Sequence, residues 1–181
     1  MTFTDWRTPR ALFDPLHAKI GFAVDAAADQ DNHLVDRWYG DGGEEPDALS
    51  VSIWDSPAFC NPPYGKGLVE WLQKFNEQRI RGARVISLLP AYPETEWWYD
   101  YVVKPGADIF FLVGRVAFER ACPECAGSGP VTCPLCQGSK IDPKISQPRH
   151  PSALVIYEPQ STGQVSWLRW KEPKNADGST S

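Results

Sequence analysis

Long hydrophobic runs are missing from this sequence of 181 residues. Nowhere do apolar residues approach the roughly 20 in succession that a membrane-spanning helix requires, and residues 1–10 lack the basic and then apolar segments of a signal peptide. Histidines are also few, and the positions of His17, His33 and His150 fit neither metal-ligand nor catalytic-triad spacing. We therefore expect a cytoplasmic protein with no membrane partner, and we assign no site to the histidines.

Positive charge is scarce over the whole chain, whose net charge is -5. The acidic side chains gather in residues 1–60, which hold 4 basic and 11 acidic residues. Residues 61–84 hold 5 basic and 2 acidic side chains, and residues 115–150 hold 5 and 3. Contact with phosphates depends on local rather than total charge. The composition therefore permits a face that binds nucleic acid but does not require one.

The length and the 42% hydrophobic content suit one substantial core, so we expect a single domain. Apolar segments alternate with helical patterns in the first two thirds of the chain, which is typical of crossover units around a mostly parallel sheet. Adjacent strands near the end would add an antiparallel edge. The sequence thus predicts a three-layer α/β domain, with helices from residue 9, at 68–81 and at 95–103, and strands at 22–24, 58–60, 84–89, 108–113, 115–118, 153–157 and 165–170.

Local signals refine this expectation at two places. The hydroxyl of Thr8 could cap a helix whose first position is Pro9, and Pro15 should kink or split that helix. Residues 36–57 are rich in glycine and acidic side chains, which predicts a loop. A loop of that length suggests a functional role.

The tetrapeptide Asn61-Pro62-Pro63-Tyr64 follows a predicted buried strand directly. An amine conjugated to a planar ring is a poor nucleophile, so a catalyst must hold its hydrogens with acceptors. The side-chain oxygen of Asn61 and the carbonyl of Pro62 could do this in a loop stiffened by two prolines. Tyr64 offers an aromatic face for a base swung out of a duplex. These residues are the predicted catalytic motif.

The same tetrapeptide could be only a turn, because asparagine and proline are common turn residues. Its position favours the functional interpretation, since open α/β sheets bind ligands beyond the carboxyl ends of their strands. Asp25 also stands at a predicted strand end, so we expect Asp25 and Asn61 to face one cleft. By itself the motif indicates methyl transfer to a planar nitrogen and does not specify adenine.

Four of the five cysteines fall in one short segment as two Cys-x-x-Cys pairs separated by seven residues. In a cytoplasmic chain this spacing favours metal over disulfides. Four thiolates would close a tetrahedral zinc site with no open position, so the zinc would be structural. The alternative is a set of unrelated buried or redox-active cysteines. The predicted ligands are Cys122, Cys125, Cys133 and Cys136.

In addition to these motifs, the sequence resembles the small phage-type DNA N-6-adenine methyltransferases related to Dam. The resemblance covers about residues 5–118 and 150–157, and the order and spacing of its pieces make it specific. It implies a class I (Rossmann-like) fold, S-adenosylmethionine as methyl donor, double-stranded DNA as partner, adenine N6 as the target, and the host cytoplasm if a phage encodes the chain. The pieces are Trp6-x-Thr8-Pro9-x-x-Leu12-Phe13, Gly21-Phe22-x-x-Asp25-Ala26-Ala27-Ala28 with Asn32, Ala48-Leu49, Trp54, Phe59 to Gly65, Leu88-Leu89-Pro90-Ala91, Thr95-x-Trp97-Trp98, Gly114-Arg115-x-x-Phe118 and Pro151 to Val155.

The resemblance also implies a set of donor-binding residues. Thr8 and Pro9 would contact the methionine end, Asp25 and the alanines after it would line a loop that is glycine-rich in related folds, and Asp47 could hold the donor's adenine amine. The sequence has no Gly-x-Gly there. Asp25 could instead be a buried helix-capping carboxylate and Thr8 an ordinary N-cap. The predicted donor-binding residues are Trp6, Thr8, Pro9, Asp25, Ala26, Ala27 and Asp47.

Residues 119–149 depart from the family's usual pattern as an insert within a methyltransferase domain of residues 1–171. The polar tail, 172–181, is expected to be disordered. The insert could contact DNA, although a purely structural zinc staple is an alternative. The predicted DNA contacts are Lys66, Arg115, Arg120, Lys140, Lys144 and Arg149.

Three functions remain open from the sequence. The first is adenine N6 methylation in DNA. The second is methylation of RNA or of a protein amide, which the same catalytic motif would serve. The third is a non-catalytic, zinc-bearing nucleic-acid-binding protein built on a methyltransferase scaffold, against which the intact tetrapeptide argues.

Overall fold

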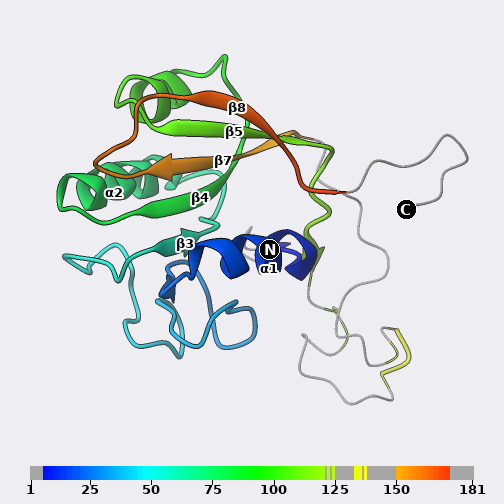
Figure 1. The fold of residues 1–181 in the computed structure, drawn as a ribbon. Coiled ribbons are helices and arrows are strands. Elements are labelled where there is room, and N and C mark those ends of the chain that lie inside the picture. Colours follow the sequence, from blue (N-terminus) through cyan, green and yellow to red (C-terminus); the bar gives the residue numbers. More distant parts are fainter. Residues whose placement is uncertain are drawn as a thin grey trace, which may run out of the picture.

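A six-stranded sheet forms the centre of the described part of the chain (Figure 1). The computed structural model describes residues 6–120, 122, 124, 133–135, 137 and 150–171. The strand order is β2-β3-β4-β7-β5-β8. The strands are β2 (Val24–Asp25), β3 (Ala58–Cys60), β4 (Val85–Pro90), β5 (Asp108–Val113), β7 (Ser152–Tyr157) and β8 (Val165–Arg169).

Strand β7 runs opposite to the other strands of this sheet, and it lies in the interior between β4 and β5. The edge strand β8 is parallel to its neighbour β5. The prediction of a mostly parallel sheet is confirmed, but the prediction of an antiparallel edge is wrong. The last two strands flank β5 instead of pairing with each other, because Asp108 of β5 accepts the backbone N–H groups of Thr162 and Gln164 in their connection.

Helices cover the sheet on both faces, as expected for three layers. They are α1 (Arg10–Ile20), α2 (Leu68–Ile80) and a helical segment made of α3 (Glu96–Trp98) and the π-helical turn η1 (Tyr99–Val103). One core cluster joins α2, α3 and η1 to Val85 and Leu89 of β4, while a second joins α1 to Ile86 and Leu88 of the same strand. Alternate residues of one strand thus enter opposite cores. None of the helices in the described residues is both long and apolar enough to cross a membrane.

The first helix differs from its prediction at both prolines. Its N-cap residue is Pro9, and no side chain caps it, so the prediction that Thr8 is the cap is wrong. The helix also continues through Pro15 without a break. Proline removes the hydrogen bond to the carbonyl four residues earlier. Ala11 and Pro15 are both exposed, so water can hydrate that carbonyl.

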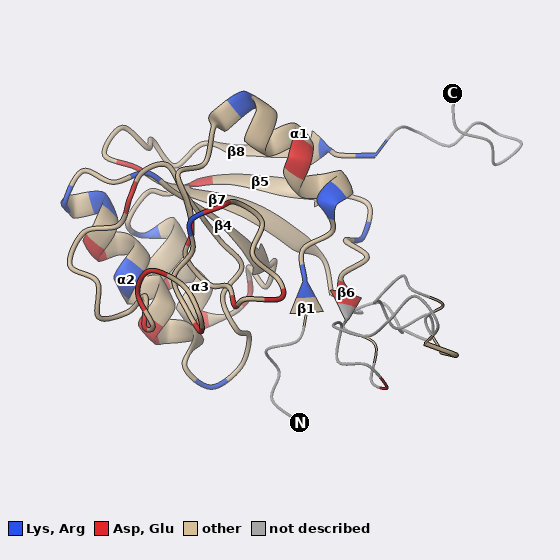
Figure 2. Ribbon diagram, turned by 90° about the horizontal axis from the view of Figure 1, so that it is seen from below, with Lys and Arg blue, Asp and Glu red and all other residues tan. Residues whose placement is uncertain are grey.

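A short two-stranded ribbon joins the start of the chain to residues beyond the main sheet. Strand β1 (Trp6–Arg7) pairs with β6 (Glu119–Arg120) in antiparallel fashion, and Figure 2 shows the two strands side by side. The strand predicted at 115–118 is wrong. Val116 and Phe118 are buried in the core, which explains the alternating pattern that suggested a strand. Residues 115–118 nevertheless form no ladder within the described structure.

Candidate active site

A pocket of about 300 Å³ opens at the carboxyl ends of β2 and β3. Its size lies at the lower end of the range for small-molecule sites. Asp25 and Asn61 both line it, as expected from their positions at strand ends. The complete lining is Trp6, Arg7, Thr8, Asp25, Ala27, Ala28, Asp29, Asn32, Leu34, Tyr39, Gly40, Pro46, Asp47, Ala48, Phe59, Asn61, Pro62, Pro63, Tyr64 and Trp71.

The catalytic motif predicted from the sequence lies entirely on this pocket. The Nδ2 group of Asn61 donates to the backbone oxygen of Trp6 at 3.2 Å. This bond fixes which end of the amide is the acceptor and leaves Oδ1 on the other side. The hydroxyl of Tyr64 lies 2.8 Å from that Oδ1. The side chain of Asn61 is therefore held at both ends.

The ring of Tyr64 is anchored to the sheet as well as to Asn61. Its hydroxyl also lies 2.9 Å from the backbone oxygen of Leu88, on β4. Burial raises the pKa of Tyr64 well above its ordinary value, so the phenol stays protonated and acts as a donor. The ring meets Phe118 and His150 nearly at right angles. Tyr64 thus has a fixed plane at the rim of the pocket.

Asp25 is the buried carboxylate of the pocket, with 3% of its surface exposed. Its oxygens accept the backbone N–H groups of Ala27 at 3.4 Å and Leu34 at 3.2 Å. Burial raises its pKa from 3.8 to about 7, although these two bonds and the nearby His33 and Arg10 lower it. No helix begins after Asp25, so the alternative of a helix-capping carboxylate is wrong. Asp25 instead holds the two ends of the loop 26–34 together, because its side chain accepts hydrogen bonds from Ala27 and Leu34.

Among the residues with a predicted role in binding the donor, most reach the pocket. Trp6, Thr8, Asp25, Ala27 and Asp47 line it. Pro9 and Ala26 are buried but are not among the lining residues. The side chain of Asp47 is already engaged, because its Oδ1 accepts the backbone N–H of Leu49 at 3.0 Å. One of its two carboxylate oxygens is therefore committed to the loop.

Comparison with protein families agrees with this geometry. The family described as DNA N-6-adenine-methyltransferase (Dam) matches residues 3–175. The chain belongs to this family. Membership implies a transferase that methylates adenine N6 in DNA, and DNA is accordingly the substrate. A search among curated proteins finds no match.

One wall of the pocket in this Dam-family chain was not identified from the sequence. Trp71 projects from α2 and lines the pocket together with Tyr39 and Ala48 of the long loop. All three contact Trp54: its ring lies 6.4 Å from Tyr39 and 6.3 Å from Trp71, and its Nε1 donates to the backbone oxygen of Ala48 at 2.9 Å. The fully buried Gln78 accepts the backbone N–H of Trp54 at 2.7 Å. The wall is therefore fixed to α2.

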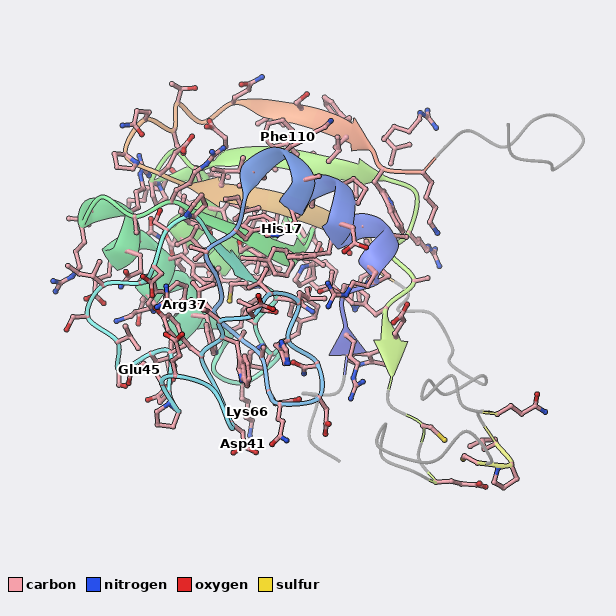
Figure 3. All side chains as sticks on the ribbon, turned by 60° about the horizontal axis from the view of Figure 1, so that its bottom comes forward. His17, Arg37, Asp41, Glu45, Lys66 and Phe110 are labelled. Atoms are coloured by element: carbon pink, nitrogen blue, oxygen red, sulfur yellow. The ribbon has the colours of Figure 1, made fainter. Side chains whose placement is uncertain are left out.

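The loop predicted at residues 36–57 is confirmed, and its side chains hold it in place. Figure 3 shows Arg37 and Glu45 within it. The hydroxyl of Tyr39 donates to Oδ2 of Asp55 at 2.7 Å, and Arg37 binds the same oxygen at 2.9 Å. The hydrogen bond from Tyr39, and then Arg37, hold the pKa of Asp55 below its usual value. Arg37 also binds Glu44 through two nitrogens.

Two of the four cysteines predicted to bind zinc belong to the described residues. Cys122 and Cys133 are buried, and their Sγ atoms are 3.9 Å apart. A disulfide would need about 2.05 Å, whereas two sulfurs on one tetrahedral zinc lie about 3.8 Å apart. Cys125 and Cys136 lie outside the described residues. The described residues by themselves contain no group of three potential ligands. The two visible thiols thus suit two positions of a tetrahedral site.

The predicted DNA contacts are only partly visible in the Dam-family chain. Lys66 and Arg115 are exposed, and Lys66 follows the catalytic motif by two residues in the sequence. Figure 3 shows Lys66 at the end of the molecule where Asp41 lies. Arg120 belongs to β6, but its side chain is not described. Figure 2 also shows basic residues on β1 and α1, which the sequence analysis had not selected. The remaining predicted contacts, Lys140, Lys144 and Arg149, lie outside the described residues.

Proposed function

We propose that this protein transfers the methyl group of S-adenosylmethionine to N6 of an adenine turned out of double-stranded DNA, and that the transfer occurs at the motif 61–64. The observation that carries the proposal is the fixed orientation of Asn61. Its Nδ2 is bound to Trp6, so Oδ1 presents an acceptor in the same pocket that holds the buried carboxylate of Asp25. One pocket therefore has groups for both reactants.

The role of Asn61 follows from the chemistry of the target amine. The N6 lone pair of adenine is delocalised into the ring, and it becomes nucleophilic when the amine hydrogens are held out of the ring plane. Oδ1 of Asn61 would accept one hydrogen and the carbonyl of Pro62 the other. As the new N–C bond forms, N6 acquires positive charge, and these two oxygens stabilise that charge. S-adenosylmethionine would supply the methyl group: its sulfonium–methyl bond would break as the N–C bond forms, S-adenosylhomocysteine would leave as a neutral thioether, and N6 would release one proton to water.

The donor end of the pocket is acidic. Asp25, Asp29 and Asp47 line it, and Arg7 is the basic residue among the lining side chains. This charge suits a donor that carries a sulfonium and an ammonium group. A positive group beside Asp25 would stabilise its charged form, because it would offset the burial that raises the pKa of this carboxyl group. Trp6 of β1 and Thr8, which precedes α1, line the same pocket.

Tyr64 would receive the extruded base. Enzymes that modify a base inside a duplex turn it out into a pocket and stack it against aromatic side chains. The hydroxyl of Tyr64 is bound to Leu88 and Asn61, so its ring cannot rotate freely. A base stacked on this ring would have its amine close to the acceptor of Asn61. Lys66 and Arg115 would hold the flanking phosphates.

Zinc at the four cysteines would be structural. The separation of Cys122 and Cys133 supports shared coordination, and four thiolates would leave no open position for a reactant. The role of such a site would be to fold the segment between β6 and β7. If that segment also contacts DNA, its basic side chains Lys140, Lys144 and Arg149 would make the contacts.

The decisive experiment measures transfer of tritiated methyl groups from S-adenosylmethionine to DNA, RNA and protein. We expect incorporation into unmethylated duplex DNA, recovered as N6-methyladenine. Asn61→Ala should reduce the rate by roughly 10²–10³-fold, the cost of removing one positioned polar group in other enzymes. Asn76→Ala is the matched control, because Asn76 is also half-buried but binds Leu72 and Tyr101 away from the pocket. Transfer to RNA or protein instead of DNA, or no transfer at all, would overturn the proposal.

A further inference from the structure

Two aromatic side chains make edge-to-face contacts with the ring of Tyr64. The ring centroid of Phe118 lies 6.3 Å from that of Tyr64, at an interplanar angle of 87°. The ring of His150 lies 6.2 Å away, at 72°. Edge-to-face contacts of this kind are favourable because the positive edge of one ring meets the negative face of another. They fix the plane of Tyr64 from two directions.

The positions of these two residues in the chain are as informative as their contacts. Phe118 immediately precedes the predicted insert, residues 119–149, and His150 immediately follows it. The two residues that flank the insert in the sequence therefore both contact Tyr64. The sequence indicates no role for His150, because this residue lacks the spacing of a metal ligand or a catalytic triad. Its contact with Tyr64 depends on tertiary structure, which spacing does not show.

His150 is held by its surroundings as a neutral ring. It also packs against Tyr92, with ring centroids 5.6 Å apart at 68°. Burial lowers its pKa. Among the described residues its Nδ1 has no hydrogen-bond partner. Among the described residues, what His150 offers Tyr64 is therefore the ring contact.

Asn61 is also connected to the start of the insert, through hydrogen bonding and strand pairing. Strand β6 starts directly after Phe118, and its Arg120 is paired with Trp6 of β1. The backbone oxygen of Trp6 in turn accepts the bond that orients the amide of Asn61. Both functional side chains of the catalytic motif are thus connected to residues at or next to the ends of the insert.

We propose that Phe118 and His150 are positioning residues that hold Tyr64 in the plane required for methyl transfer, so that the two ends of the insert set the geometry of the catalytic motif. This proposal rests on the proposed function, in which Tyr64 receives the target base. Neither residue lines the pocket, so in this proposal both act through Tyr64. Their effect is on the rate of the bound complex, while binding of the donor depends on the other end of the pocket.

The test compares His150→Ala with His150→Phe. Losing the ring should lower kcat by roughly tenfold, as expected for a small loss of alignment, with little change in the KM for S-adenosylmethionine. Phenylalanine keeps an edge for Tyr64 and should restore most of the rate. Phe118→Leu should resemble His150→Ala. If His150→Phe is as slow as His150→Ala, the imidazole nitrogens and not the ring matter, and the proposal fails. Full activity of His150→Ala overturns it as well.

His17→Ala is the matched control. His17 is a half-buried histidine whose ring stacks at 5.4 Å on Phe13, a member of the core cluster that also contains Phe118. No ring contact joins His17 to Tyr64 among the described residues. This variant should lower the melting temperature and leave kcat of the folded protein unchanged. An equal loss of kcat in His17→Ala would show that core destabilisation, and not positioning, explains the effect.

A second measurement does not depend on activity. Fluorotyrosine is incorporated, and the fluorine resonance of Tyr64 is assigned by its absence in Tyr64→Phe. In His150→Ala and Phe118→Leu this resonance should move toward that of an exposed tyrosine, and in His17→Ala it should stay in place. An unmoved resonance contradicts the positioning role. If the resonance moves but the wild-type protein methylates no DNA, the positioning role stands and the proposed function fails.

Discussion

The hydroxyl of Tyr64 lies 2.8 Å from Oδ1 of Asn61 and 2.9 Å from the backbone oxygen of Leu88. A phenol has one proton to donate, so these two acceptors compete for it. When Leu88 receives the proton, Oδ1 of Asn61 keeps its full capacity to hold the target amine. The strand β4 thereby influences how strongly the catalytic amide can act.

Tyr64→Phe should lower kcat by about tenfold, because the ring remains for stacking while the bond that anchors it is lost. A typical hydrogen bond contributes up to about 1.5 kcal/mol, and about 1 to 1.4 kcal/mol corresponds to a factor of about 5 to 10. Tyr64→Ala should lose far more, since it also removes the stacking face. Both rates are measured by methyl incorporation at saturating donor. Equal losses in the two variants would contradict separate roles for the hydroxyl and the ring.

Asp25→Asn should remove a pH dependence of stability. The pKa of Asp25 is 3.8 in the unfolded chain and about 7 in the folded protein. Between these values the folded protein holds a proton that the unfolded chain has lost, so stability falls as pH rises toward about 7 and this contribution then levels off. Melting temperatures from pH 4 to pH 8 should show that fall in the wild type and a smaller one in the variant.

His33 and Arg10 face Asp25 in both proteins, so the difference between the two curves isolates this carboxylate. Parallel curves would contradict the assignment. The same ionisation affects the proposed donor, whose positive groups prefer the charged carboxylate. We therefore expect S-adenosylmethionine to bind the wild type more tightly as pH rises through about 7, and to bind Asp25→Asn weakly at every pH.

Trp54→Phe should raise the KM for the donor by roughly fivefold and change kcat little. The variant loses the indole N–H that holds Ala48, a residue of the pocket wall, and leaves Asn61 untouched. The roughly fivefold rise in KM corresponds to the loss of one buried hydrogen bond. Trp167→Phe is the control, because Trp167 lies on β8 and is 69% exposed. A fall in kcat with unchanged KM would mean that Trp54 acts on the catalytic motif instead.

Zinc analysis tests the cysteine segment. Purified protein should contain stoichiometric zinc, and Cys122→Ser or Cys133→Ser should lower both the zinc content and the melting temperature. Cys60→Ala is the comparison variant, since Cys60 is buried in β3 outside this segment and should not alter the zinc content. Fully active protein without zinc would rule the site out. A chelator that leaves the melting temperature unchanged would do the same.

Lys66→Ala should weaken DNA binding and lower its salt dependence. Removing one phosphate contact reduces the slope of log K against log salt by about 0.9. Lys104 is another exposed lysine, beyond η1, and Lys104→Ala should leave both quantities unchanged. Fluorescence anisotropy with a labelled duplex at several salt concentrations provides the slopes. An unchanged slope for Lys66→Ala would remove this residue from the DNA interface.

The parts of the fold that the sequence predicted are those with strong local signals. The second helix was predicted at 68–81 and is observed at Leu68–Ile80, because its apolar spacing and the glycine after it are both local. The strand before the catalytic motif and the approach of Asp25 to Asn61 were also predictable, since the carboxyl ends of neighbouring parallel strands meet at one edge.

The parts that were missed depend on contacts between distant segments. Strands β1 and β6 are two residues long and more than a hundred residues apart, so no local pattern marks their pairing. Trp71 belongs to an apolar helical stripe, and periodicity cannot distinguish a residue that lines a pocket from one in the core. The place of β7 inside the sheet is likewise a choice of partner strand, which alternating hydrophobicity leaves open.

The reversed direction of β7 has a consequence for how this fold can change during evolution. Strand β5 ends at the edge of the sheet where the pocket opens, and β7 begins at that same edge, with Ser152 paired to Pro90. A connection between them need not cross the sheet. A gene can therefore acquire codons between these two strands without disturbing the strand pairing of the main sheet.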